Sequence, residues 1–483
     1  MTCTGKIITT TPSDFAVRGG SFPYFGCSAA SEDPAVKCVI TLFSGNSALS
    51  DSKPSLSMDY RLRNPISLFA TRVDLVPGDY RVTSSVSSGA GAAQDTAAIK
   101  IFDTASSVVS VANQGQLNTA LQNIKNQSAT HVKILIASGT YVYPTGSSYD
   151  LSAQDKLVTF EALGSAYFTG TNPFNVKWAS WVKVSFTNPA GTAFSAQIGS
   201  HHAFRRCQFS GAATALIASA GSYVRVEDCH MHSVTTGFVN VAIVRGLSWT
   251  KVSGVVFHNC PVIESTTGRR NISTNAGTGI LKRQCVWALY DGPLTNVVIR
   301  ENLVLDDYST IILSDSLLTN AAIVGNTFVT TGVLCIQLGS LANSCIINNT
   351  LISPSTTPSI SVTGSSFRTA VVNNFATMVE SAIRKIADTG YWSNNAFETA
   401  PRIGSNYVIG DPRFENSYKF LSIVSPIREA GASVGGILTI QGLPIGKQIG
   451  SMPYHVDIGL QHIYANMRSD SLFGFSMPAV IPT

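Results

Sequence analysis

Charged side chains are scarce in this chain. Asp, Glu, Lys and Arg make up 13% of its 483 residues, about half the share found in an average globular domain. Disorder is not expected, because it combines low hydrophobicity with high net charge, whereas here the hydrophobic share is 44% and the formal net charge only +5. A long coiled coil needs abundant Glu, Lys and Arg. Two basic doublets, Arg205-Arg206 and Arg269-Arg270, make no nucleic-acid-binding patch. The composition favours an extended β architecture with no nucleic-acid partner.

Three further features are missing from the sequence. No apolar run reaches the roughly 18 residues that span a membrane, so we expect no membrane insertion. The nine cysteines are widely spaced and include no CxxC pair, which favours buried free thiols over a disulfide framework or a zinc site. Residues 1–10 lack the apolar stretch and cleavage site of a secretory signal. We therefore expect a protein that is made and used without Sec export.

The first part of the chain predicts a small all-β domain. Residues 1–107 contain short strand-like runs separated by turns and no helical pattern, which is typical of a β-sandwich. The run 75–83 resembles the last hairpin of an immunoglobulin-like domain. A single amphipathic helix follows at 114–125, where Leu117, Leu121 and Ile124 form one apolar stripe. We interpret this helix as a cap that covers the exposed strand edges of a β stack.

Beyond the helix the chain repeats itself. An apolar residue, two further residues, Asn and then a small or apolar pair recur at intervals of 24, 23, 25 and 21 residues. The asparagines are Asn302, Asn326, Asn349, Asn374 and Asn395. Upstream, Cys207, Cys229 and Cys260 occupy the same slot. This period, with β-branched residues in place of a leucine-rich signature, predicts a parallel β-helix. We expect the asparagines to stack as a hydrogen-bonded ladder and the cysteines to fill the same corner without a ladder.

These features resemble the right-handed parallel β-helix superfamily, which includes pectate-lyase-like proteins and phage tailspikes. The progression Asp411-Pro-Arg-Phe, Ser425-Pro-Ile-Arg-Glu-Ala-Gly and Asp457-Ile-Gly looks like the closing turns common in such proteins. The resemblance covers residues 108–463 and indicates the fold. It is not specific for an activity, because this fold carries many activities. The fold expected is therefore all-β: an N-terminal immunoglobulin-like sandwich over 1–107, a helix-capped β-helix over 108–463, and a tail over 464–483.

The arrangement of these parts favours a phage tailspike or tail fibre. The tail carries Leu472, Phe473, Phe475 and other apolar residues, which need a partner subunit for burial. The resemblance then implies a homotrimer in the virion tail. The N-terminal domain would dock on other tail proteins, and the β-helix would recognise, and in the enzymatic form cleave, a host cell-surface polysaccharide. Two alternatives stay open: a free-standing, extracellular polysaccharide lyase or hydrolase, and a non-catalytic structural virion protein or adhesin.

One group of residues is the candidate active site of such a depolymerase. Aligning the Cys slots places Arg205, Glu227 and His258 in one column, and Arg206 and Asp228 in the next. Neighbouring coils lie about 4.8 Å apart, within reach of the carboxyl separations of glycoside hydrolases. Glu227 or Asp228 would serve as acid or base, with His258 or His230 as proton partner and Arg205 neutralising charge. The alternative interpretation is a column of solvated cross-strand pairs.

Binding residues and cofactors follow from the same reasoning. Trp178 and Trp181 are candidate sugar-stacking platforms, with Arg206 and His230 as further substrate contacts. No cofactor is expected for a hydrolase. Lyases of this superfamily use Ca²⁺, for which the acidic turn Asp306-Asp307 offers oxygen ligands. The competing interpretation of that turn is a solvated loop.

Overall fold

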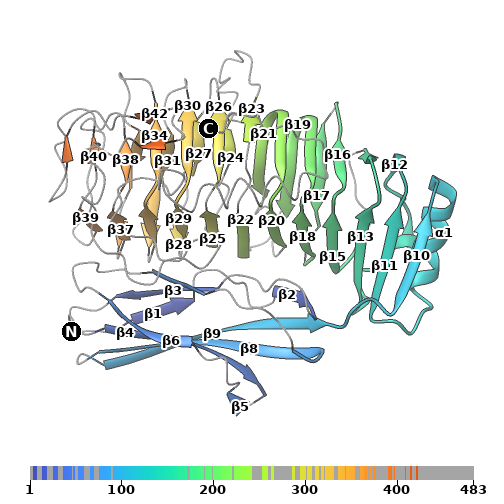
Figure 1. Ribbon diagram of the computed structural model, residues 1–483, viewed down its shortest axis with the longest axis horizontal. Helices are drawn as coiled ribbons and strands as arrows, with labels where there is room; N and C mark the ends of the chain where they lie inside the picture. The colour runs from blue at the N-terminus through green and yellow to red at the C-terminus, as the bar shows by residue number, and fades with distance from the viewer. Residues whose placement is uncertain are drawn as a thin grey trace, which may run out of the picture.

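The computed structural model describes residues 75–241 almost continuously, with gaps at 89–90, 171–174, 190, 198 and 220–221. It also describes separate strands and short segments before residue 75 and between 253 and 421. Two long parallel sheets dominate (Figure 1). No described helix is long and apolar enough to cross a membrane.

The first long sheet, here called the β10 sheet, runs along one side of the molecule. Its strands lie in the order β10 (Ser107–Val111), β11 (His131–Ile136), β13 (Leu157–Ala162), β15 (Trp178–Val182), β18 (His201–Arg205), β20 (Tyr223–Glu227), β22 (Ser253–His258), β25 (Leu294–Arg300), β29 (Ala322–Val324), β33 (Cys345–Ile347), β37 (Thr369–Val372) and β39 (Gly390–Ser393). Short strands β28 (Leu317–Thr319), β32 (Ser340–Ala342) and β36 (Ser366–Phe367) pair beside this path.

The second long sheet, the β12 sheet, lies opposite the first. Its order is β12 (Gly139–Val142), β14 (Ala166–Thr169), β16 (Ser185–Thr187), β17 (Thr192–Ala196), β19 (Gln208–Ser219), β21 (His230–Val241), β23 (Ile263–Ser265), β24 (Cys285–Ala288), β26 (Leu303–Asp306), β27 (Thr310–Leu313), β30 (Thr327–Thr330), β31 (Ile336–Leu338), β34 (Thr350–Ile352), β35 (Ile360–Val362), β38 (Phe375–Ala376), β40 (Ala396–Phe397) and β41 (Val408–Ile409). From β11 onward the chain passes from the β10 sheet to the β12 sheet and back in each coil, so the fold is a parallel β-solenoid, as the repeat predicts.

Alternation of side chains along each strand fills the space between the sheets. In β13, β14 and β15 the inward residues include Phe160, Phe168 and Trp181, all fully buried. Phe160 and Trp181 stack with ring centroids 4.1 Å apart. Because parallel strands keep the same register from coil to coil, such contacts continue along one shared core. The polar, low-charge composition therefore reflects a fold in which only every second strand residue needs to be apolar.

The predicted helix is confirmed as α1 (Gln114–Ile124). The side chain of Asn113 accepts a hydrogen bond from Gln116 N at its start, which is a typical N-cap. Leu117, Leu121 and Ile124 are fully buried and join the solenoid core. The helix packs beside β10, the first strand of its sheet, and thus covers the end of the stack.

The asparagine ladder is present in the coils that the structure describes. Asn326 Oδ1 accepts from Asn302 N at 2.9 Å and from Asn302 Nδ2 at 3.0 Å. The same bonds link Asn326 to Asn349 and Asn349 to Asn374. The Nδ2 groups of Asn326, Asn349 and Asn374 also donate to backbone carbonyls, as Asn326 does to Ile299 O at 2.8 Å. The fifth repeat member, Asn395, lies outside the described residues.

The cysteines are expected to fill the corner without a ladder, but the coils that carry them are linked by a hydrogen bond to sulfur. Cys207 N donates to Cys229 Sγ at 3.3 Å, which repeats the backbone half of the asparagine ladder with sulfur as acceptor. Both thiols are buried and free. The shape of the corner explains the bond to sulfur. It points the backbone N–H of one coil at the side chain in the same slot of the next coil, which offers Sγ in a cysteine and Oδ1 in an asparagine. Cys260 lies outside the described residues.

The residue before the ladder slot adopts a left-handed conformation. Lys183, Arg206, Asp228 and Asn348 have φ values of 61°, 55°, 52° and 54°, and Gly325 has 66°. This conformation costs most residues energy, and glycine, asparagine and aspartate least. It turns the chain between the two sheets and lets a backbone bond cross the corner, as from Arg206 N to Glu227 O at 3.0 Å.

The N-terminal strands form two further sheets. One contains β1 (Thr4–Ile7), β3 (Phe25–Ala30) and β7 (Ile66–Phe69), and the other β2 (Asp14–Val17), β9 (Gly91–Phe102), β8 (Gly78–Ser88), β4 (Val36–Ser44), β5 (Ser47–Ala48) and β6 (Lys53–Met58). Both lie beside the β10 sheet in Figure 1. An immunoglobulin-like arrangement and the domain boundaries stay predictions. A short 3-10 helix, η1 (Ser147–Tyr149), and the pair β42 (Phe414–Glu415) and β43 (Phe420–Leu421) complete the elements. The tail over 464–483 lies outside the described residues.

Candidate functional site

The structure brings the predicted column together. Arg205, Glu227 and His258 pair directly in β18, β20 and β22, and Arg300 of β25 pairs with His258. Four successive coils thus carry an ionisable residue at the last position of their strand in the β10 sheet. Arg205 is exposed and Glu227 is half-buried. The His258 side chain lies outside the described part of the chain.

A second charged column stands at the adjoining corner. Lys183, Arg206 and Asp228 occupy the left-handed position of three successive coils, one residue beyond the strands of the β10 sheet. Lys183 N donates to Arg205 O at 3.1 Å, and Arg206 N donates to Glu227 O. The backbone therefore holds these coils in register at the corner. We call Lys183, Arg205, Arg206, Glu227 and Asp228 the corner strip.

Glu227 has a neighbour that the sequence analysis did not consider. Its Oε1 lies 3.4 Å from Arg225 Nε, and the two side chains are 15% and 8% exposed. Arg225 Nη2 also donates to Phe15 O of β2 at 3.3 Å, and its guanidinium lies over the Phe15 ring. The carboxylate of Glu227 is therefore tied to the place where the N-terminal strands meet the solenoid.

His230 lies across the corner from Glu227. It opens β21 in the β12 sheet and pairs with Gln208 of β19. His230 N donates to Cys207 O at 3.0 Å, through the backbone. His230 and the corner strip thus belong to the same edge of the solenoid but to different sheets, and both ring nitrogens of His230 are buried.

The two predicted aromatic platforms are covered by protein. Trp181 points into the core and is fully buried. Trp178 points outward from β15, yet it is only 5% exposed, because it stacks on His201 at 4.1 Å and meets the rings of Phe15 and Phe102. The prediction of ligand stacking on these rings needs correction, since neither leaves a face for a sugar.

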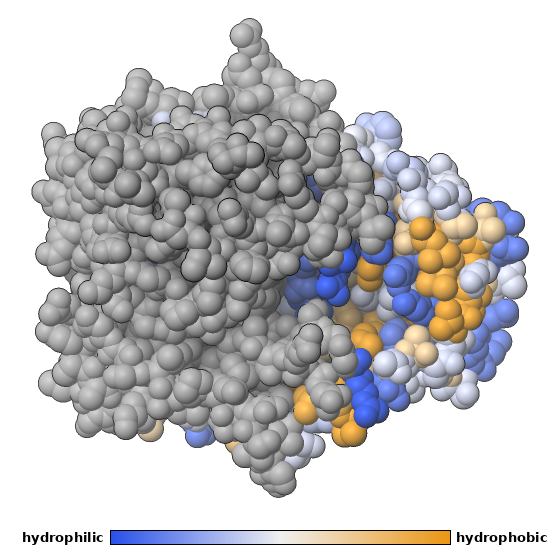
Figure 2. All heavy atoms as spheres, in the orientation of Figure 1, coloured by the Kyte–Doolittle hydropathy of each residue, from blue (hydrophilic) through white to orange (hydrophobic). Residues whose placement is uncertain are grey.

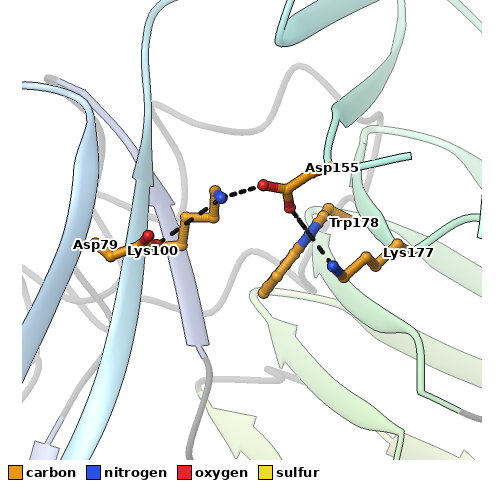
Figure 3. A network of polar contacts seen from close by, with 5 residues as sticks. All are labelled: Asp79, Lys100, Asp155, Lys177 and Trp178. Atoms are coloured by element: carbon orange, nitrogen blue, oxygen red, sulfur yellow. Dashed lines mark hydrogen bonds and ion pairs between the residues drawn. The ribbon is translucent and has the colours of Figure 1, made fainter. Parts of the chain in front are cut away.

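Asp155 joins the N-terminal strands to the solenoid (Figure 3). Its carboxylate pairs with Lys100 of β9 and accepts from Trp178 Nε1 at 3.1 Å, and Lys177 Nζ lies 3.6 Å away. Lys100 also approaches Asp79 at 3.8 Å. Burial acts to raise the pKa of Asp155, but Lys100, Trp178 and Lys177 outweigh it and lower that pKa. With Phe15 and Phe102, these residues make the contact between the two parts.

One aromatic residue that the sequence analysis missed is exposed. Tyr167 in β14 is 40% exposed, and it is the only aromatic residue among the exposed large hydrophobic side chains of the described residues. Its neighbours Ala166 and Phe168 are buried. The alternation of Ala166–Thr169 is the signal that could have found it, because an aromatic residue between two buried positions of a strand faces outward.

No candidate metal centre stands out. Among the described residues no group of three or more His, Cys, Asp or Glu side chains comes together. Asp306 ends β26, where it pairs with Ser265 and Thr330, and Asp307 lies outside the described residues. The Ca²⁺ prediction for this turn therefore stays a prediction.

Comparison with known proteins adds little to this picture. No protein-family model matches the chain, and no curated protein matches it. Among solved structures, it is similar to the catalytic domain of a GH87 α-1,3-glucanase, with 8% identity over 80% of this chain and 86% of that one and a TM-score of 0.25. It is also similar to a pectate lyase from Xanthomonas campestris, with 14% identity, 69% and 89% coverage and a TM-score of 0.24. At these TM-scores neither likeness assigns an activity to this chain.

Proposed function

We propose that this β-solenoid recognises a polysaccharide along the edge that carries the corner strip. The observation that carries the proposal is the in-register run of Arg205, Glu227, His258 and Arg300 over four consecutive coils. A polymer that follows the solenoid axis meets an ionisable group at every coil of this run. Such a periodic surface suits a periodic ligand better than a small molecule, which binds in a deep pocket.

The chemistry of the strip also suits cleavage. Its two carboxyl groups, Glu227 and Asp228, are neighbouring residues of one coil, and the coils that carry Arg205 and His258 stack on either side of it at about 4.8 Å. Glu227 or Asp228 would act as acid or base, with His258 or His230 as proton partner. Arg205 would neutralise a carboxylate of the ligand or charge that develops in the transition state. In a lyase Ca²⁺ would share this last task.

The biological setting we propose is a phage tailspike or tail fibre. In this setting the N-terminal strands attach to other virion tail proteins, the solenoid faces the host-cell polysaccharide, and residues 464–483 hold three chains together. The apolar character of that tail supports the trimer. A free-standing polysaccharide lyase or hydrolase is the second candidate, and the stacked carboxylates and cations of the strip favour it over a purely structural protein.

Light scattering on the full chain tests the assembly. A particle of three times 51.2 kDa that dissociates when residues 464–483 are deleted is the expected result. A monomeric full chain would refute the tailspike assignment and favour the free-standing enzyme.

Cleavage is tested separately with host-envelope and acidic polysaccharides, with and without Ca²⁺, by the appearance of oligosaccharide ends. We expect Glu227→Gln and Asp228→Asn to lower the rate at least about 100-fold, the usual contribution of an acid or base. The matched control is Glu161→Gln, because Glu161 stands in the same column at an earlier coil and pairs with Lys133. Full activity in both test variants would exclude the strip as the catalytic group.

A further inference from the structure

The outer face of the first coils in the β12 sheet is rich in hydroxyl groups. Two outward columns cross it in register. The first is Thr140, Tyr167, Ser185, Gln208 and His230, and the second is Val142, Thr169, Thr187 and Ser210. The inward residues between them, such as Phe168 and Phe186, are fully buried. The outward side chains therefore stand on a rigid, packed layer.

Among the described residues of this face, the exposed large apolar side chains lie in its first coils. Tyr167 is 40% exposed, Val142 54% and Leu163, at the corner beside them, 65%. Figure 2 shows apolar residues interleaved with hydrophilic ones over the end of the solenoid that carries α1. The N-terminal strands lie beside the opposite, β10 sheet (Figure 1). The Tyr167 ring is therefore not covered in the way that the Trp178 ring is.

Positive charge borders the same face. Lys183 stands at the corner two residues before Ser185, and Arg205, on the next coil, ends β18 of the β10 sheet at the same corner. Neither side chain makes an ion pair with another described residue, whereas Lys133 pairs with Glu161 and Lys100 with Asp155. Two cations without acidic partners beside an exposed aromatic ring and rows of hydroxyl groups complement a sugar chain that carries carboxylates.

We infer that this face is a docking platform for an acidic polysaccharide. A sugar ring stacks on Tyr167, hydroxyl groups of the chain hydrogen-bond with Thr169, Thr187 and Ser185, and Lys183 and Arg205 hold its carboxylates. The chain then runs along the axis toward the corner strip at Glu227 and Asp228. The inference rests on the proposed function, which it deepens by naming the surface and the charge of the ligand.

The test is titration calorimetry on the full chain with alginate and carboxymethyl dextran as acidic probes and plain dextran as the neutral one. We expect binding of at least one acidic probe, weakened about tenfold by Tyr167→Ala and little by Tyr167→Phe, which keeps the ring. Lys183→Asn removes the charge at a backbone conformation that asparagine tolerates. It should weaken binding about threefold and reduce its salt dependence.

The matched control is Lys133→Gln, which removes a cation from the β10 sheet and should bind as the original protein does. Binding of the acidic probes that is unchanged in both Tyr167→Ala and Lys183→Asn would overturn the platform alone. Equal binding of dextran and its carboxymethyl form would overturn the acidic assignment. Failure of the original protein to bind either acidic probe would overturn the platform and count against the proposed function as well.

Discussion

Replacing Asn326 by alanine should remove one complete rung of the asparagine ladder. The side chain is fully buried. It accepts two hydrogen bonds from Asn302 and donates one to Ile299 O and one to Asn349 Oδ1. Alanine supplies none of these groups, and the space it leaves is enclosed by the neighbouring coils.

The magnitude follows from the groups that lose a partner. Asn302 N–H, Asn302 Nδ2–H and Ile299 O are left without the Asn326 side chain in a buried corner. A buried polar group without a partner costs about 1–3 kcal/mol, and partial relaxation lowers the sum. We therefore expect Asn326→Ala to lower the free energy of unfolding by about 4 kcal/mol.

Cys229→Ala is the matched comparison in the cysteine coils. Cys229 is also fully buried, but its thiol accepts from Cys207 N and donates to Glu227 O at 3.2 Å, and a thiol is a weak donor and a weak acceptor. We expect a loss of about 2 kcal/mol, mostly from the lost packing of the thiol. Equilibrium urea unfolding followed by circular dichroism measures both variants. Equal losses in the two variants would refute the view that the amide network, rather than side-chain volume, stabilises this corner.

Two further predictions concern His202 and Phe15. Burial first, and then the charge of His201, lower the pKa of His202 from 6.5 to about 3, so between pH 6.5 and about pH 3 the unfolded chain takes up this proton and the folded chain does not. The contribution of neutral His202 to the free energy of unfolding should therefore be fully present above pH 6.5. That free energy should fall by about 2 kcal/mol between pH 7 and pH 5. His202→Leu should flatten the pH dependence of urea unfolding, and an equally steep dependence in that variant would contradict the assignment. Phe15→Ala should cost about 3 kcal/mol at the contact with Trp178 and Phe102, and a tryptophan emission spectrum that does not shift would contradict the contact.

The predicted column could be found by counting residues. Parallel strands pair in register, so a repeat that positions Cys207 and Cys229 also positions Arg205 beside Glu227. Helix α1 was equally readable, because its apolar stripe and its N-cap Asn113 are local features of the sequence. The ladder that begins at Asn302 could also be predicted from the sequence, since residues repeated at a constant interval stack on one another in this fold.

The role of each outward side chain was decided only by the tertiary structure. Trp178 and Tyr167 both point outward from strands of the solenoid, yet Phe15 and Phe102 from the N-terminal strands cover the first ring, and the second stays exposed. Glu227 pairs with Arg225 of its own strand, and only the bond from Arg225 to Phe15 O of β2 ties this pair to the N-terminal strands. Alternation along a strand determines whether a side chain faces the core or the surface. Whether that surface is covered depends on contacts between segments far apart in the sequence, which no local pattern records.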